Sequence, residues 1–233
     1  MLLSATTFEP SESGKFRISP WLMFLVYPVC RLLLLIYFRQ IEISGQENMP
    51  KQGPVIIAPT HRSRWDALLV SLAVGRGVSG RDLRFMVTAT EMTGIQGWFI
   101  RHLGGFPIDL KHPEFTILAH SVALLKEGEW LVIFPEGGIF RDNKVHPLKR
   151  GVGRIALEVL AQQPDSSIQI LPIGLQYDPS CPTWGSQAKI EIGKPLAVSD
   201  YEATSMKSSS EALTLSLQQC LQALIDKSLF KIS

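Results

Sequence analysis

The apolar run at residues 55–58, together with the helical stretch that follows it, constrains the fold of this chain more than any other feature. Residues 55–58 are apolar and largely β-branched, which predicts a strand buried on both faces. Residues 66–74 have the composition of a helix. A buried strand that leads into a helix is typical of α/β proteins. Open α/β sheets place their functional sites at such connections, and this one contains His61.

Similar runs recur along the chain. Further strands are expected at residues 41–43, 83–87, 130–134, 168–175 and 188–193. Further helices are expected at residues 113–127, 149–161 and 209–230. These elements predict an α/β domain with a mixed, largely parallel sheet flanked by helices, and 233 residues are enough for one such core.

Three details predict where particular residues lie in this fold. Pro172 falls near the middle of its run, which predicts an edge strand, a bulge or a strand end because proline donates no ladder hydrogen bond. Trp98 and Phe99 are expected in the core, with contact to acyl chains as the alternative. The C-terminal helix is expected to cover the sheet through leucines that recur at helical spacing. These leucines are Leu213, Leu217, Leu221 and Leu224.

The N-terminal region divides into two parts ahead of the domain at residues 41–233. Residues 1–16 are expected to be mobile, and residues 17–40 to form a membrane-associated helical segment. The apolar stretch within it is close to the length of a bilayer span, but Pro28 and Arg31 near its middle oppose a simple span. We therefore favour a kinked, monotopic helix in one leaflet over a true span or a core helix.

Composition limits the compartment and the partners. A net charge of +2 is too small to indicate a nucleic-acid partner. Three widely spaced cysteines lack any metal-ligand or disulfide pattern, which indicates a reducing environment and the cytosolic face of a membrane. A local basic concentration could meet an anionic substrate or a lipid headgroup. It consists of Arg141, Lys144, Lys149, Arg150 and Arg154.

His61 and Asp66 are the first candidate catalytic residues. They are five positions apart and cannot meet inside one regular helix. If Ser63 is the N-cap, Asp66 occupies the third helical position and the turn could fold His61 back towards it. Such a pair would give an imidazole with one nitrogen fixed and the other free to accept a proton. The alternative is a capped helix beside an exposed loop histidine.

Glu136 is the second candidate. It follows the predicted strand at residues 130–134 and precedes Gly137 and Gly138. A carboxylate at the carboxyl end of a parallel strand faces the same crevice as the His61 turn. The alternative is an ordinary turn residue.

Four blocks, taken together over residues 55–192, resemble the glycerolipid acyltransferase family. The first is the H-x4-D pattern of His61 and Asp66, and the others are residues 104–109, 134–137 and 171–173. The basic residues Lys149 and Arg150, followed by glycine, also resemble an element of these enzymes.

The resemblance implies transfer of a fatty acyl group from a thioester of coenzyme A or acyl carrier protein to the free hydroxyl of lysophosphatidate, making phosphatidate. It implies His61 as general base oriented by Asp66, no cofactor beyond the thioester co-substrate, and membrane lipids as partners. Oxyanion donors are expected among backbone N–H groups of the His61 turn or Gly137. The residues that it implies in substrate binding are Glu136, Gly137, Arg141, Lys149 and Arg150.

Two departures from the family pattern concern the acceptor. Leu110 follows Asp109 where the family usually has arginine, and Gly138 stands where it usually has threonine followed by arginine. Those arginines bind the acceptor phosphate, so Arg141, Lys149 or Arg150 would have to replace them. The alternatives are another acceptor such as a lysophospholipid, a non-catalytic membrane-binding protein, or a hydrolase. The oligomeric state is not specified by these residues.

Overall fold

A computed structural model describes residues 18–88, 92–108, 113–142, 144–201 and 205–228 of the chain. The segment expected to be mobile, residues 1–16, lies outside these ranges. So do Asp109 and Leu110 of the second family-like block.

An eight-stranded sheet forms the centre of the protein, with the order β1-β7-β6-β2-β5-β3-β4 and with β8 paired to β6. The strands are β1 (Gln40–Ser44), β2 (Val55–Pro59), β3 (Leu83–Thr88), β4 (Gly105–Ile108), β5 (Trp130–Val132), β6 (Gln169–Asp178), β7 (Gln187–Ile192) and β8 (Leu196–Ala197). Strands β6, β2, β5, β3 and β4 run parallel, and β7 is antiparallel to β6. The predicted mixed, largely parallel sheet is confirmed.

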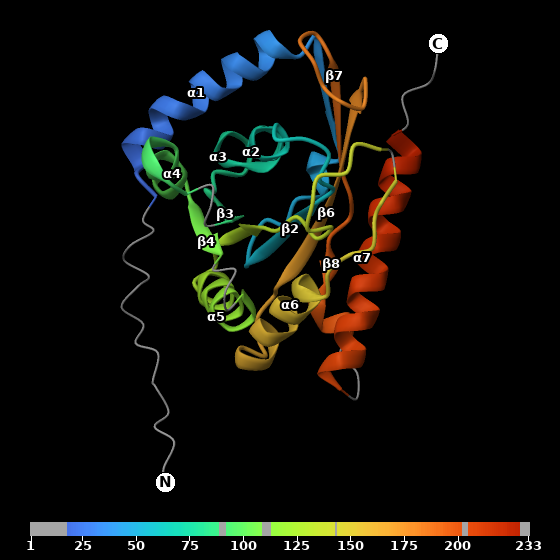
Figure 1. The fold of residues 1–233 in the computed structure, drawn as a ribbon. Coiled ribbons are helices and arrows are strands. Elements are labelled where there is room, and N and C mark those ends of the chain that lie inside the picture. Colours follow the sequence, from blue (N-terminus) through green and yellow to red (C-terminus); the bar gives the residue numbers. More distant parts are fainter. Residues whose placement is uncertain (1–17, 89–91, 109–112, 143, 202–204, 229–233) are drawn as a thin grey trace.

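Helices cover both faces of this sheet (Figure 1). They are α1 (Pro20–Tyr37), α2 (Asp66–Val74), α3 (Arg76–Ser79), α4 (Gly94–His102), α5 (Pro113–Lys126), α6 (Gly151–Gln162) and α7 (Met206–Ser228), with short 3-10 turns η2 (Gln46–Asn48) and η4 (Val198–Tyr201). Residues of β2 alternate between two apolar clusters: Val55 and Ile57 pack with α1 and α2, whereas Ile56 and Ala58 pack with α5, α6 and α7. Strand β2 is therefore buried on both faces, as the sequence predicts.

The C-terminal helix covers the sheet as expected. Helix α7 packs against β6, and its four leucines at helical spacing are all buried. On the same helix, Lys227 donates to the Glu191 carboxylate of β7. Burial on its own would raise the pKa of Glu191, but the hydrogen bonds from Lys227 and Ser44 lower it.

The prediction for Pro172 left an edge strand, a bulge and a strand end open. Pro172 lies in the interior of the sheet and of its strand, so the edge-strand and strand-end alternatives are wrong. It belongs to β6, which has β2 on one side and β7 and β8 on the other. On that second side β8 pairs with residues 169–170 and β7 pairs from Ile173 onwards. The carbonyl of Pro172 accepts from Gly193 on this side. The proline therefore sits where β6 changes partners, and its missing N–H removes no ladder bond.

Helix α4 corrects a second expectation, because Trp98 and Phe99 are not in the core. Their side chains are 44% and 41% exposed. Gly97 packs against the backbone of Met92, where an added Cβ would lie 2.2 Å from the Met92 carbonyl carbon. Helix α4 therefore packs on the rest of the protein through Gly97 and Ile100, and Trp98 and Phe99 lie on its exposed side.

Helix α1 is continuous through Pro28. Its buried residues are Leu22, Met23 and Leu34, and most of its other apolar side chains are exposed. Its length and hydropathy would allow a membrane span, although only 17% of the 18-residue window is buried in the protein. The exposure of α1 contradicts the alternative of a core helix, and the helix in one leaflet stays a prediction.

Candidate functional site

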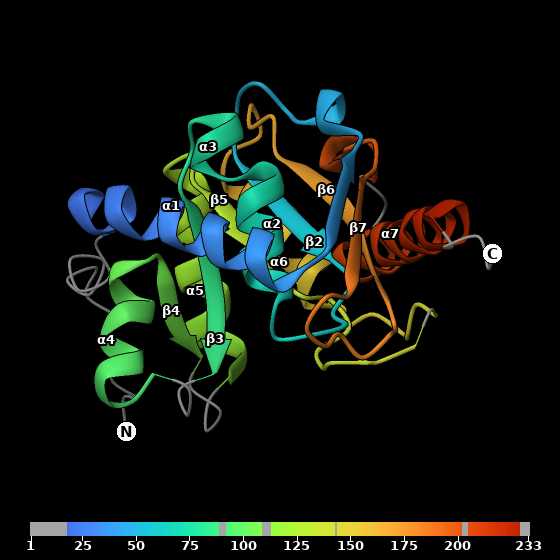
Figure 2. The ribbon, with the colours of Figure 1, turned by 90° about the horizontal axis from the view of Figure 1, so that it is seen from above.

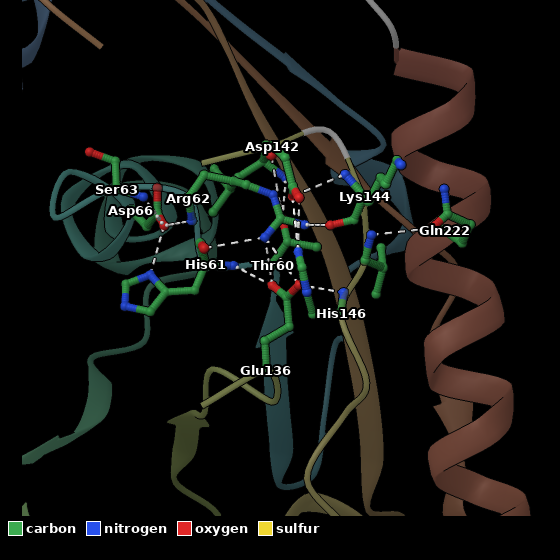
Figure 3. A network of polar contacts seen from close by, with 12 residues as sticks. Thr60, His61, Arg62, Ser63, Asp66, Glu136, Asp142, Lys144, His146 and Gln222 are labelled. Carbon is green, nitrogen blue, oxygen red and sulfur yellow. Dashed lines mark hydrogen bonds and ion pairs between the residues drawn. The ribbon is translucent and has the colours of Figure 1, made fainter. Parts of the chain in front are cut away.

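The turn between β2 and α2 brings His61 and Asp66 together. His61 Nδ1 lies 2.8 Å from Asp66 Oδ2 (Figure 3). The same oxygen accepts the backbone N–H groups of Arg62 at 2.6 Å and Ser63 at 2.9 Å. Three donors thus converge on one buried carboxylate oxygen, which fixes the orientation of the Asp66 side chain. With Nδ1–H donating to Asp66, Nε2 is the acceptor nitrogen of the ring, and the His61 side chain is 21% exposed.

The capping of α2 differs in position from the prediction. The helix begins at Asp66 with Trp65 as the N-cap residue, so Ser63 is not the N-cap. One bond of a capping box nevertheless forms at the turn, because the Ser63 N–H donates to the Asp66 carboxylate. Ser63 Oγ accepts from the Trp65 N–H at 3.3 Å, and the Asp66 N–H donates to the Ser63 carbonyl. These bonds hold residues 61–66 in the compact turn that folds His61 back onto Asp66.

The other oxygen of Asp66 is bound by Tyr177, which the sequence reasoning missed. Tyr177 Oη donates to Asp66 Oδ1 at 2.5 Å. Burial, reinforced by the neighbouring Asp66 charge, raises the pKa of the Tyr177 phenol well above its ordinary value, so it remains a donor. Tyr177 lies on β6, 111 positions from Asp66. A buried strand residue at that separation carries no local signal of its partner.

Aromatic residues at the end of α1 pack behind this pair. The Tyr37 ring lies 4.3 Å from that of Trp65, and the Phe38 ring stacks on Tyr177 at 5.8 Å. The C-terminal end of the apolar helix is therefore in contact with residues that support Asp66.

Glu136 lies on the opposite side of the His61 turn and is buried. Its Oε2 accepts the backbone N–H of His61 at 2.8 Å, and its Oε1 accepts that of His146 at 2.9 Å. Arg62 Nη1 donates to both oxygens, at 2.8 and 3.1 Å, while Arg62 Nη2 donates to the Lys144 carbonyl at 2.7 Å. Glu136 thus joins the turn to the loop at residues 137–149 (Figure 3).

That loop crosses the His61 turn. The Phe134 ring stacks on the His61 ring at 4.0 Å, and the Phe140 N–H donates to the His61 carbonyl at 2.9 Å. Gly137 has φ +72°, a left-handed conformation that suits glycine. Strand β5 ends at Val132, two residues earlier than predicted.

A second histidine–aspartate pair stiffens the loop. His146 Nε2 lies 3.0 Å from Asp142 Oδ2, and the His146 ring stacks on Phe140 at 3.8 Å. Burial opposes ionisation of Asp142, but the bonds from His146 and the Lys144 N–H lower its pKa.

The three candidate phosphate-binding cations have different surroundings in the structure. Arg141 is exposed and follows Phe140, so its backbone lies beside the His61 turn. The Lys149 side chain lies against Gly137. Arg150 forms an ion pair with Glu211 of α7 at 3.0 Å, with the guanidinium directed to that helix. Arg141 and Lys149 are therefore better placed than Arg150 to meet a substrate anion at the loop.

The expected oxyanion donors are already engaged. The N–H groups of His61, Arg62 and Ser63 donate to carboxylates, and that of Gly137 donates to the Phe134 carbonyl at 3.2 Å. These N–H groups therefore stabilise the turn and are not directed at a substrate oxygen. The His61 imidazole can accept a proton at Nε2 while the buried Asp66 carboxylate holds Nδ1. This arrangement suits a general base that acts on a hydroxyl. Within the described ranges, no three His, Cys, Asp or Glu side chains are grouped so that they could hold a metal ion.

Comparisons with known proteins identify the family. A sequence profile of the acyltransferase family matches residues 40–176, which contain the His61 turn and the Glu136 loop. The 1-acyl-sn-glycerol-3-phosphate acyltransferase of Bacillus subtilis is 27% identical over 195 residues, covering 80% of this chain and 89% of that protein. The mitochondrial glycerol-3-phosphate acyltransferase 1 of Sus scrofa is 29% identical over 177 residues, covering 69% of this chain and 21% of that protein.

A solved structure has the same fold. The crystal structure of the 1-acyl-sn-glycerophosphate acyltransferase of Thermotoga maritima matches with a TM-score of 0.72 and 18% identity, covering 97% of this chain and 86% of that chain.

Proposed function

The chain belongs to the acyltransferase family, and on that premise we propose that it transfers a fatty acyl group from a thioester to the free hydroxyl of lysophosphatidate, making phosphatidate. The observation that carries the proposal is the His61 imidazole held at Nδ1 by the buried Asp66 carboxylate. The Bacillus subtilis relative, matched over most of both chains, supports the acceptor by its name. Glycerolipid acyl transfer makes the protein an O-acyltransferase.

The proposed reaction proceeds in two proton transfers at one nitrogen. His61 Nε2 takes the proton of the acceptor hydroxyl as the hydroxyl oxygen attacks the thioester carbonyl carbon. Asp66 stabilises the resulting imidazolium. The tetrahedral intermediate then collapses: the carbon–sulfur bond breaks, the imidazolium returns its proton to the departing thiolate, and the ester remains. No acyl-enzyme intermediate and no cofactor beyond the thioester enter these steps.

The thioester donor is proposed to be acyl-coenzyme A or acyl carrier protein. Purified protein in detergent should be given each thioester separately with lysophosphatidate, and the lipid products identified by mass spectrometry. Formation of phosphatidate with either donor is the expected result. Thioester consumption without a lipid product would instead indicate hydrolysis and would contradict the proposed function.

The proposed arrangement at the membrane places residues 17–40 in one leaflet and residues 41–233 on the cytosolic face as the catalytic domain. The exposed apolar side chains of α1 support this placement. So does the contact of its end residues Tyr37 and Phe38 with Trp65 and Tyr177, which brings the site close to the lipid surface.

A second acceptor is favoured by one observation. Gly138 stands where the family pattern usually has threonine followed by arginine, which weakens the argument for a terminal phosphate. A lysophospholipid without that phosphate is therefore the alternative, and a panel of acceptors with one donor would separate the two. The assembled His61–Asp66 pair argues against the non-catalytic alternative.

Arg141 is proposed to bind the acceptor phosphate, with Lys149 beside it. We expect Arg141→Ala to raise the KM for lysophosphatidate about tenfold, because a charge-assisted bond to an ionised group contributes roughly 1.5–3 kcal/mol. Arg150→Ala should raise it less, since Arg150 is directed to Glu211. Initial rates at varied acceptor concentration provide the measurement, and equal effects of the two substitutions would refute this division.

Tyr177 is proposed to act as a positioning residue for Asp66. We expect Tyr177→Phe to lower kcat about tenfold with little change in KM, because an unpartnered buried carboxylate oxygen costs roughly 1–3 kcal/mol and frees the carboxylate to rotate. Tyr37→Phe is the matched control: it also removes one phenol hydroxyl, whose partner is the Pro182 carbonyl at 3.2 Å. Steady-state kinetics of both variants test the role. If the two lose the same activity, Tyr177 does not act through Asp66.

A further inference from the structure

Helix α4 presents an apolar stripe that no other part of the described structure covers. Ile95, Trp98 and Phe99 have the i, i+3, i+4 spacing of one helical face and are 80%, 44% and 41% exposed. Of the nine described residues of α4, only Gly97 is buried. Short helices in water derive most of their stability from burying an apolar face against another surface. The apolar face of α4 has no such surface within the described structure, which indicates an interaction site.

The stripe is held in a fixed direction. Gly97 packs closely on the Met92 backbone, and an added Cβ at Gly105 would lie 2.3 Å from Ile100. The His102 carbonyl accepts the N–H of Ser19 at 3.0 Å. These contacts attach the opposite side of α4 to the sheet and to the start of α1, which leaves Ile95 pointing away from the protein.

Helix α1 lies next to α4 and is exposed in the same way. The Ser19–His102 bond joins their ends, and both views show α4 beside the N-terminal end of α1 (Figures 1 and 2). Eight large apolar side chains of α1 are exposed. They are Trp21, Phe24, Leu25, Val29, Leu32, Leu33, Leu35 and Ile36.

The charges of the two helices indicate which surface they would contact. Neither α1 nor α4 contains Asp or Glu, whereas Arg31 and Arg101 give each one a cation. Apolar and aromatic side chains combined with cations and no anions are the composition of segments that lie in the interface of an anionic bilayer, where tryptophan is also favoured.

We propose that α4 is a second membrane-contacting element, which inserts Ile95, Trp98 and Phe99 into the same leaflet as α1. The two helices then orient the domain on the bilayer at two points. The end of α1 that is remote from α4 leads to the aromatic residues behind Asp66. The proposal rests on the proposed function only in that the substrate is a lipid.

Vesicle binding tests the proposal independently of catalysis. Full-length protein and its Ile95→Asp variant are sedimented with vesicles of phosphatidylcholine and phosphatidylglycerol. We expect the substitution to weaken partitioning about tenfold or more, because it places a charge where an apolar side chain would be buried. The matched control is Leu215→Asp, which charges a side chain 57% exposed on α7 and should bind as the parent does. Unchanged binding of Ile95→Asp, or an equal loss in Leu215→Asp, would overturn the proposal.

A spin label locates the stripe directly. The label is attached to Ile95→Cys in a chain whose Cys30, Cys181 and Cys220 are replaced by serine. On addition of vesicles, its accessibility to oxygen should rise and that to a polar nickel reagent should fall, while a label at Leu215→Cys stays in water. A label at residue 95 that remains in water overturns the proposal, as does one that becomes buried without vesicles, which indicates a second copy of the chain instead. The Ile95→Asp variant should still transfer acyl groups to lysophosphatidate dispersed in detergent. This measurement distinguishes a loss of membrane binding from failure of the proposed function.

Discussion

Replacing His61 by alanine is expected to lower kcat for acyl transfer about a thousandfold, within the range of roughly 10²–10⁴ found for the loss of a general base. The physical reason is that no other acceptor is held at the end of β2 by a buried carboxylate: Asp66 Oδ2 lies 2.8 Å from Nδ1 of this ring. Single-turnover rates with one thioester and lysophosphatidate measure the loss without interference from product release.

His146→Ala is the matched control for that experiment. His146 is also bonded to an aspartate, Asp142, and its backbone N–H is bonded to the same Glu136 as that of His61. It differs from His61 in that its imidazole contacts only Asp142 and Phe140 among the described interactions, both residues of its own loop. We expect less than a tenfold loss for His146→Ala. Retained turnover in His61→Ala, with folding and vesicle binding intact, would refute the role of His61 as the base.

Glu136→Gln is expected to lower the free energy of unfolding by about 3 kcal/mol, because breaking a buried ion pair costs roughly 3–5 kcal/mol. Glu136 is the ion-pair partner of the buried Arg62, 2.8 Å away, and both side chains are almost fully inaccessible. The neutral amide would leave the buried Arg62 guanidinium without its ion-pair partner. Denaturant unfolding followed by circular dichroism measures the change.

Glu211→Gln provides the reference for that measurement. It removes the carboxylate of the ion pair with Arg150, in which both side chains are exposed, and such pairs contribute at most about 1 kcal/mol. A Glu136→Gln variant as stable as Glu211→Gln but inactive would show that Glu136 meets the substrate, as the family resemblance implies. A variant that is both unstable and inactive would show that Glu136 holds the His61 turn and the loop together.

The position of Glu136 was predictable from the sequence, but its contacts were not. The sequence placed Glu136 in the same crevice as His61, because both follow buried parallel strands, and the structure brings them within one hydrogen bond. It did not reveal that the Glu136 oxygens accept from Arg62 and His146. Those contacts depend on the path of residues 137–149, an irregular loop with no periodicity from which to predict it.

Strand and helix positions were largely predictable because local patterns determine them. The runs at residues 55–58 and 66–74 predicted β2 and α2, and the leucine spacing predicted the buried face of α7. The errors occurred where an element's environment decided the outcome. Pro172 is tolerated inside the sheet because β6 changes partners there, and Trp98 is exposed because α4 packs on the protein through Gly97 and Ile100 instead.

The sequence by itself determined the alternation of strands and helices and the apolar character of α1, since each follows from spacing or composition within a few residues. The spacing of His61 and Asp66 allowed their pairing but left an exposed loop histidine as the alternative, and the structure decided between the two. Only the tertiary structure decided which groups complete the site. Tyr177 reaches Asp66 from 111 positions away, and Arg62 reaches Glu136 from 74 positions away. Such partners are set by the order of β2, β5 and β6 in the sheet, and strand order is a property of the whole chain that no local pattern encodes.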